Sequence, residues 1–234
     1  MGSIRRSGHV LSTLLGTGCL AAIEFAWTVR SSQGDALWCV GERFTRAFEM
    51  LGGGFLKIGQ ILATRRDLLP LEMLKPMERL QDNVCPLPFE QVRQLVERSL
   101  QTKLEETFLQ FDPVPLASAS IAQVHRATLR RGGRQVVIKL KRPGIESLME
   151  TDARLFSKVV RLLIWLPLFK GAPLNEAIQQ VVDALKSQTS FRTEAEVHQR
   201  FYERFCFSDT VYIPQLVGNL SNEDLLVIEY VPNL

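Results

Sequence analysis

The sequence contains little of what a disulfide framework or a metal site requires. Its 234 residues include four cysteines and three histidines. The cysteines are far apart and form no C-x-x-C pair, which favours free thiols in a reducing compartment over disulfides: Cys19, Cys39, Cys85 and Cys206. His9, His125 and His198 show no H-x-x-x-H spacing, so no metal site is predicted.

A strong excess of charge is also missing. The formal net charge is +3, and charged residues make up 23% of the chain. Arg130, Arg131 and Arg134 gather around one turn instead of forming a basic face, so we expect no nucleic-acid partner. A serine nucleophile is not supported either, because Ser118 and Ser120 lie outside any G-x-S-x-G elbow.

Long hydrophobic runs are absent beyond the N-terminus. There, Arg5 and Arg6 precede an apolar stretch at 10–22, and the span up to residue 29 approaches the thickness of a membrane. Polar residues, including Glu24, interrupt it. Three alternatives stay open: a helix on a membrane surface or against a partner, a buried helix, and a true span or signal sequence.

The most informative stretch predicts a β-hairpin. Residues 124–129 and 135–140 are short apolar-rich runs, and Gly132-Gly133 between them allows a tight turn. Lys139 emerges from the β-branched end of the second run. The preceding loop, 117–122, carries short side chains apart from Ile121, so its backbone can approach a ligand closely. A small-residue loop followed by a strand lysine is the arrangement with which kinases hold phosphates.

Two motifs carry a resemblance to a known family. Residues 116–125 read Leu-Ala-Ser-Ala-Ser-Ile-Ala-Gln-Val-His, and residues 57–60 read Lys-Ile-Gly-Gln. The first resembles the alanine-rich loop, and the second the Lys-x-Gly-Gln motif, of the UbiB/AarF family of atypical kinase-like proteins. The resemblance extends from about Gly41 to the last residue and is greatest to the proteobacterial UbiB branch, which is associated with ubiquinone biosynthesis.

The resemblance implies a nucleotide site. In it, the loop would cover the phosphates of ATP, Lys139 would pair with them, and the end of the last strand would form the hinge beside the adenine. Lys57 and Gln60, neighbours on one helix face, would gate the pocket. The implied ATP-binding residues are Leu116, Ala117, Ser118, Ala119, Ser120, Ile121, Ala122, Gln123, Val124, Lys139, Glu229 and Val231. From the residues alone, strand 225–231 could equally be buried without a ligand.

A helix glutamate completes the implied site. In kinases such a glutamate pairs with the strand lysine and aims its ammonium at the phosphates. The resemblance assigns this positioning role to Glu194. Periodicity alone leaves Glu196 and Glu203 as rivals.

The chain departs from the family pattern just before Glu194. The family carries Glu-x-Asp where this sequence reads Gln188-Thr189-Ser190. Mg²⁺ favours anionic oxygen ligands, which a neutral triplet does not supply. The resemblance implies ATP with Mg²⁺ as cofactors, but this departure argues against metal-dependent turnover.

The patterns together predict an α+β fold: a helical extension at 1–109 and a kinase-like small lobe at 110–234, with an antiparallel sheet. Expected helices cover 36–56 with a stop or kink at the glycines, 71–81, 89–99, 104–108, 145–166 and 174–207 with a bend near Ser190; further strands are expected at 211–214 and 225–231. The chain ends after the hinge, before the segments in which kinases carry their catalytic base and metal-binding residues. We therefore expect no catalytic residue here, and a fragment without the large lobe.

The expected function is that of a UbiB-type atypical kinase or ATPase, with weak nucleotide binding and no phosphoryl transfer by this chain alone. The resemblance implies a place at the cytoplasmic face of a bacterial inner membrane, peripherally bound. Its implied partners are nucleotide, lipid or a membrane that carries quinone precursors, and proteins of ubiquinone biosynthesis. The alternative is a scaffold that binds lipid or protein without nucleotide, or a product that does not fold stably.

Overall fold

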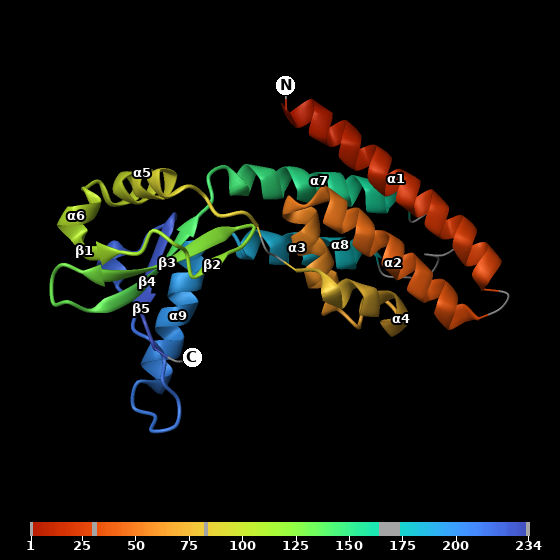
Figure 1. Cartoon of the computed structure of the whole chain (residues 1–234). Helices are drawn as coiled ribbons and strands as arrows, with labels where there is room; N and C mark the ends of the chain where they lie inside the picture. The colour runs from red at the N-terminus through yellow and green to blue at the C-terminus, as the bar shows by residue number, and fades with distance from the viewer. Residues whose placement is uncertain (1, 30–31, 82–83, 164–173, 233–234) are drawn as a thin grey trace. The chain divides into compact units, whose positions relative to one another are not determined.

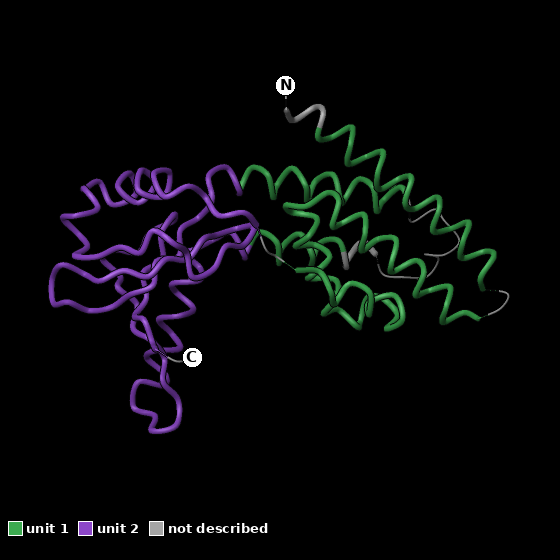
Figure 2. Tube along the Cα trace, in the orientation of Figure 1, with its two compact units in different colours: residues 1–82, 146–186 green, residues 83–145, 187–234 purple. Residues whose placement is uncertain are grey.

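The computed structural model describes residues 2–29, 32–81, 84–163 and 174–232. The chain forms two compact units, of residues 1–82 with 146–186 and of residues 83–145 with 187–234 (Figure 2). This division differs from the expected boundary at 109/110. Residues 83–109 belong with the sheet, and the segment 146–186 belongs with the N-terminal helices.

The first unit is helical. It contains α1 (Gly2–Thr28), α2 (Gln33–Leu51), α3 (Gly53–Ala63), α4 (Leu71–Leu74), the 3₁₀ helix η1 (Lys75–Arg79), most of α7 (Ile145–Leu163) and most of α8 (Leu174–Ser187) (Figure 1). The expected break at the glycines occurs between α2 and α3, where Gly52 and Gly53 have φ of 59° and 53°. The last residues of the expected helix 145–166 lie outside the described residues.

Helix α2 is the centre of this unit. Its buried side chains recur at three- and four-residue spacing, as in an amphipathic helix: Val40, Phe44, Phe48 and Leu51. Ser32 caps its N-terminus by accepting a hydrogen bond from the amide of Asp35. This face packs against α1, α3, α4 and η1.

Helix α1 buries one face and exposes the other. Val10, Leu14 and Ala21 are buried, and an ion pair joins Glu24 to Arg43 of α2. Ile23 and Trp27 are 58% and 77% exposed. Arg6–Thr28 is long and apolar enough to cross a membrane, and 22% of its most apolar stretch is buried. The helix thus packs within its own unit and keeps an apolar outer face.

The glycine of the Lys-x-Gly-Gln motif permits close packing of α3. A Cβ atom at Gly59 would lie 2.4 Å from Leu80 Cδ1 and 2.7 Å from Phe48 Cδ2. Gly59→Ala is therefore expected to destabilise the helical unit by about 1–3 kcal/mol through overpacking, measured by urea unfolding. Gly16→Ala in α1, where no atom lies within 4 Å, should be neutral or slightly stabilising. Equal stability of both variants would contradict this packing.

The second unit contains an antiparallel sheet of five strands. These are β1 (Phe108–Phe111), β2 (Ala117–Ser118), β3 (Ala122–Leu129), β4 (Gln135–Lys141) and β5 (Leu225–Glu229). The order is β1-β3-β4-β5, and β2 pairs with β3. The expected hairpin is β3–β4, with Gly132 and Gly133 at φ of 81° and 63° in its turn.

Helices cover both faces of this sheet. Helix α5 (Phe89–Leu100) and α6 (Leu104–Thr107) lie on one face, and α9 (Phe191–Phe205) lies on the other (Figure 1). The core under α5 includes Val92, Val96, Val136, Ile138 and Leu140. Because side chains alternate along a strand, Val137 and Lys139 of β4 point toward α9 on the opposite face.

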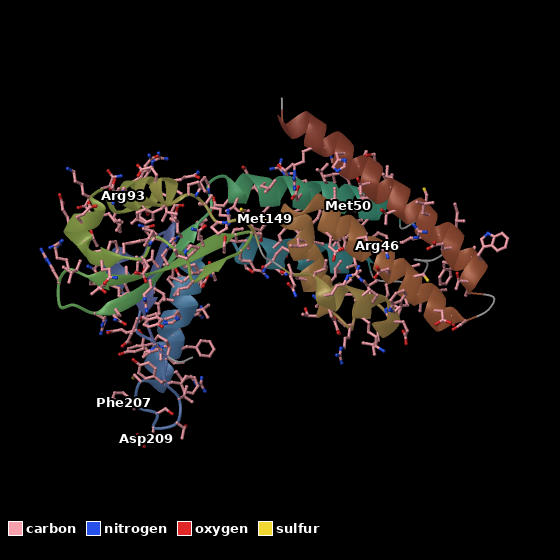
Figure 3. The ribbon with its side chains drawn as sticks, viewed as in Figure 1. Arg46, Met50, Arg93, Met149, Phe207 and Asp209 are labelled. Carbon is pink, nitrogen blue, oxygen red and sulfur yellow. The ribbon has the colours of Figure 1, made fainter. Side chains whose placement is uncertain are left out.

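The expected strand at 211–214 is wrong. Within the described part of the sheet unit, that segment forms no strand, and one isolated bridge joins Leu216 to Ile228. Pro214 has no N–H to donate to a ladder. Tyr212 is 65% exposed and Phe207, labelled in Figure 3, is 95% exposed, so no buried face holds the segment against β5. The 3₁₀ helix η3 (Gly218–Leu220) then leads into β5.

Candidate functional site

Lys139 lies in the middle of the sheet, on the face that α9 covers. In β4 it is opposite Val124 of β3 and Leu226 of β5. Its Nζ donates to both carboxylate oxygens of Glu194, each at 2.7 Å, and lies 5.0 Å from the centre of the Phe191 ring. The ammonium therefore has a carboxylate and an aromatic face as neighbours.

The start of α9 directs Glu194 toward the strand. Ser190 caps the helix by accepting from the amide of Thr193 at 3.2 Å, and Phe191 is fully buried next to it. Glu194 is then in the first turn. The rival carboxylates contact their own helix: Glu196 pairs with Arg192, and Glu203 accepts from Gln199.

The lysine–glutamate pair orients the ammonium more than it stabilises the fold. The two side chains are 32% and 40% exposed. Water screens a pair of this kind, and such pairs contribute about 1 kcal/mol or less. The bidentate geometry instead fixes where the ammonium points while leaving it accessible to an anion.

The alanine-rich loop lies in the same part of the sheet as Lys139. Ala117 pairs with Val124, which pairs in turn with Lys139, so the start of the loop is two strand spacings from the lysine, or about 10 Å. The amide of Ala119 donates to the carbonyl of Ala122 at 2.9 Å, which closes the loop as a tight turn. The register thus brings together the loop and the lysine that the sequence analysis paired.

Two motif residues after the loop belong to a buried network. Gln123 and His125 are both fully buried. The His125 Nδ1–H donates to the Asp112 carbonyl at 2.8 Å, because a carbonyl oxygen can only accept, and so His125 Nε2 accepts from the Gln123 amide at 2.8 Å. Gln123 Oε1 accepts from the amide of Leu87 at 2.7 Å. The Gln123 side chain is thereby committed to the scaffold, which leaves its backbone alone for the expected role in covering phosphates.

This network predicts a pH dependence of stability. Burial holds the pKa of His125 below its ordinary value of about 6.5, although the hydrogen bond to Asp112 opposes the shift. Just below that pH the unfolded chain binds a proton that the folded chain does not, so the free energy of unfolding decreases as the pH falls. Urea unfolding between about pH 7.5 and 5.5 should show this slope. His125→Gln should lose it and His9→Gln should keep it; the reverse would refute the assignment.

The expected hinge residues occupy the end of β5. The Glu229 carboxylate accepts from the amide of Gln215 at 3.0 Å, and this hydrogen bond holds the pKa of Glu229 below its usual value. The Glu229 amide donates to the Gln215 carbonyl at 2.9 Å. Val231 lies two residues beyond the end of the strand, after Tyr230. Both polar ends of Glu229 are thus engaged within the chain, and an adenine contact by Glu229 or Val231 stays a prediction.

Lys57 and Gln60 belong to α3, in the helical unit and not in the sheet unit. The Gln60 side-chain amide donates to the Leu80 carbonyl at 3.1 Å, which ties α3 to the end of η1. Their expected gating of the nucleotide pocket stays a prediction.

The expectation of no metal site concerns the residues just before Glu194. No group of three or more His, Cys, Asp or Glu side chains among the described residues is arranged to hold a metal ion. At the start of α9, Ser190 acts as the helix cap, and Gln188 Oε1 is buried without a hydrogen-bond partner. Neither supplies the anionic oxygen that Mg²⁺ prefers.

One polar contact at the loop was missed by the sequence analysis. Arg142, which follows β4 directly, donates from Nε to the Ala119 carbonyl at 2.7 Å. In the sequence it is a turn residue before Pro143-Gly144, and nothing in the pattern indicated a contact with a loop more than twenty positions earlier.

These features define a kinase-like small lobe: an antiparallel sheet whose central-strand lysine pairs with a helix glutamate beside a small-residue loop. The family described as ABC1 atypical kinase-like domain matches residues 79–234. The chain belongs to this ABC1, or UbiB/AarF, family of atypical kinase-like proteins.

Relatives at 34–38% identity carry the description "Probable protein kinase UbiB". The Shewanella baltica protein is 34% identical over 99% of this chain, the Aeromonas hydrophila protein 36% over 92%, and the Marinobacter nauticus protein 38% over 82%. The chain spans 44%, 39% and 35% of their respective lengths. A solved complex of Rv3197 with erythromycin from Mycobacterium tuberculosis has a TM-score of 0.55 and 27% identity, over 79% of this chain and 46% of that one.

Proposed function

We propose that this chain is the nucleotide-binding part of a UbiB-type atypical kinase or ATPase, with ATP as its ligand. The observation that carries the proposal is the Lys139–Glu194 contact, with both N···O distances at 2.7 Å. A lysine held in this way, beside a loop of short side chains, suits the triphosphate of a nucleotide. The name UbiB that the relatives carry supports the further proposal of a role in ubiquinone biosynthesis. We place the chain, as part of the same proposal, at the cytoplasmic face of a bacterial inner membrane.

Binding and turnover are separate parts of this proposal. Calorimetric titration of the 234-residue chain with ATP should give saturable one-to-one binding with a dissociation constant of about 0.1–1 mM. A coupled ATPase assay on the same sample should show no turnover. Absence of binding at several times that concentration would refute the nucleotide site, and robust Mg²⁺-dependent hydrolysis would refute the expectation of no catalysis.

Metal dependence gives a sharper prediction. Binding to the wild-type chain should be the same with Mg²⁺ and with EDTA, because Gln188 and Ser190 are neutral. The double variant Gln188→Glu with Ser190→Asp restores both carboxylates of the family pattern, and aspartate is also a good helix cap. We expect Mg²⁺ to strengthen ATP binding by this variant about tenfold or more, since charged ligands hold the cation. An equal response of the two proteins would contradict the reasoning.

A second function, binding of lipid, has its own support in the helical unit. An apolar cavity there, lined by residues that include Leu14, Phe44, Leu62, Met73, Phe156 and Val181, has a volume of only about 80 Å³, which is too small for a lipid chain, so the support comes from the surface of the unit. The outer face of α1 is apolar as well, with Trp27 77% exposed. If the chain co-sediments with liposomes, and neither ATP nor Lys139→Ala changes the bound fraction, lipid binding is favoured as the main function. Absence of co-sedimentation would refute lipid binding.

A further inference from the structure

The alanine-rich loop is held from one side by a single arginine. Arg142 donates from Nε to the Ala119 carbonyl at 2.7 Å, from one terminal nitrogen to Ser118 Oγ at 2.7 Å, and from the same nitrogen to the Cys85 carbonyl at 2.9 Å. Its backbone amide donates to the Ile121 carbonyl at 2.9 Å. Four hydrogen bonds from one residue thus connect the loop, the end of β4 and the segment before α5.

The direction of these bonds matters for an anion. Carbonyl oxygens repel a phosphate, whereas backbone N–H groups attract it. Arg142 engages the carbonyls of Ala119 and Ile121, and the amide of Val84 engages that of Ser118 at 3.2 Å. Because a trans peptide points its N–H opposite to its C=O, holding the Ala119 carbonyl turns the N–H of Ser120 away from the guanidinium. These contacts of Arg142, which we call the clamp, therefore determine which polar groups of the loop can face a ligand.

The clamp also lies where the chain leaves the sheet unit. The chain passes from one unit to the other at 82/83, 145/146 and 186/187, and the first two of these points are close in sequence to Cys85 and Arg142. The conformation of the loop is thus tied to two of the three connecting segments. A charged donor with several acceptors of this kind contributes more than a neutral hydrogen bond would.

We propose that Arg142 is the positioning residue of the alanine-rich loop, fixing it in the conformation that receives the phosphates. This rests on the proposed nucleotide function. Arg142 acts through the loop and is distinct from Lys139, which would contact the phosphates itself. Lysine at position 142 would keep the charge but lose the fork that reaches Ala119, Ser118 and Cys85 together.

The test compares Arg142→Lys with the exposed hairpin variant Arg131→Ala. The first readout, without nucleotide, is hydrogen exchange of the Ala119 amide, which is bonded to the Ala122 carbonyl. Arg142→Lys should accelerate it about tenfold, with little change in global stability, and Arg131→Ala should leave it unchanged. If the exchange rate of the Ala119 amide in Arg142→Lys equals that of the wild type, Arg142 does not hold the loop and the proposal is overturned. Ser118→Ala, which removes one of the four bonds, gives a smaller acceleration and serves if Arg142→Lys does not fold.

The second readout is the ratio of affinities for ATP and adenosine. Arg142→Lys should reduce the advantage of ATP about tenfold and leave adenosine binding unchanged, because only the phosphates meet the loop. If Arg142→Lys shows faster Ala119 exchange but keeps the wild-type ratio of ATP to adenosine affinity, then only the positive charge at position 142 matters for phosphate binding. That result would overturn the positioning role. If the wild-type chain binds no ATP, the proposed function fails while the exchange result still decides whether Arg142 holds the loop.

Discussion

Lys139→Ala is expected to abolish the thermal stabilisation that ATP gives to this chain. The ammonium is fixed by two 2.7 Å contacts with Glu194 and is 32% exposed as a side chain. Its loss removes the charged donor for the phosphates, which should weaken ATP binding by about ten- to a hundredfold. Because the partly exposed ion pair adds little to stability, the melting temperature without nucleotide should change little. The measurement is melting temperature against ATP concentration.

Two further variants separate charge from orientation. Glu194→Gln keeps the shape of the side chain but leaves the ammonium without its carboxylate partner, so an intermediate loss of about three- to tenfold is expected. Arg131→Ala removes an exposed charge from the same hairpin and should have no effect. If Lys139→Ala is stabilised by ATP as strongly as the wild type, the nucleotide lies elsewhere or does not bind.

Arg6→Met is expected to cause the largest loss of stability in the helical unit. Arg6 donates to both carboxylate oxygens of Asp152, at 3.0 and 2.7 Å, and Asp152 also accepts from the amide of Gly54 at 3.0 Å. The Asp152 side chain is fully buried. Without Arg6, the Asp152 carboxylate stays buried with only the Gly54 amide as donor, which lowers the free energy of unfolding by about 3 kcal/mol. This value is at the low end of the usual range because the Arg6 side chain is 32% exposed. Urea unfolding measures the loss.

Matched variants show whether burial is the reason. Arg154→Met removes an arginine of α7 that pairs with Glu150 at 2.7 Å but is 72% exposed, so a loss of about 0.5 kcal/mol or less is expected. In the double variant Arg6→Met with Asp152→Asn, most of the cost should be recovered, because no buried charge remains. Equal effects of Arg6→Met and Arg154→Met would show that α1 is not anchored through Asp152.

The parts of the fold that depend on local pattern could be predicted from the sequence. The β3–β4 hairpin follows from alternating apolar residues around Gly132-Gly133, and both glycines take the positive φ that the turn needs. The bend expected near Ser190 is the boundary between α8 and α9, where the serine caps the second helix. The strand expected at 211–214 is absent for a local reason as well, because Pro214 disfavours a strand in a segment whose other residues suggested one.

The grouping of the elements could not be read from local pattern. Helices α5 and α7 are both amphipathic, and nothing in their periodicity says that α5 covers the sheet while α7 joins the N-terminal helices. The buried pair of Arg6 with Asp152 joins positions 146 apart in the sequence. Such contacts are fixed by tertiary packing, which the periodicity of one segment does not encode.

The candidate site was only partly accessible from the residues. The strand and its lysine could be located, but periodicity left three carboxylates as partners, and the resemblance to the family was needed to select Glu194. Arg142 left no signal, because a turn arginine is ordinarily a solvated charge. The buried roles of Gln123 and His125 were hidden for the opposite reason: polar residues beside a loop suggest a ligand more readily than a scaffold.

The most direct test of the nucleotide site is an amide chemical-shift map of the 234-residue chain during titration with ATP. The account predicts that the largest changes occur at residues 117–124, at Lys139 and at residues 229–231, and that Lys139→Ala removes them. Changes confined to the helical unit, or a spectrum unaltered at ATP concentrations of several millimolar, would contradict it.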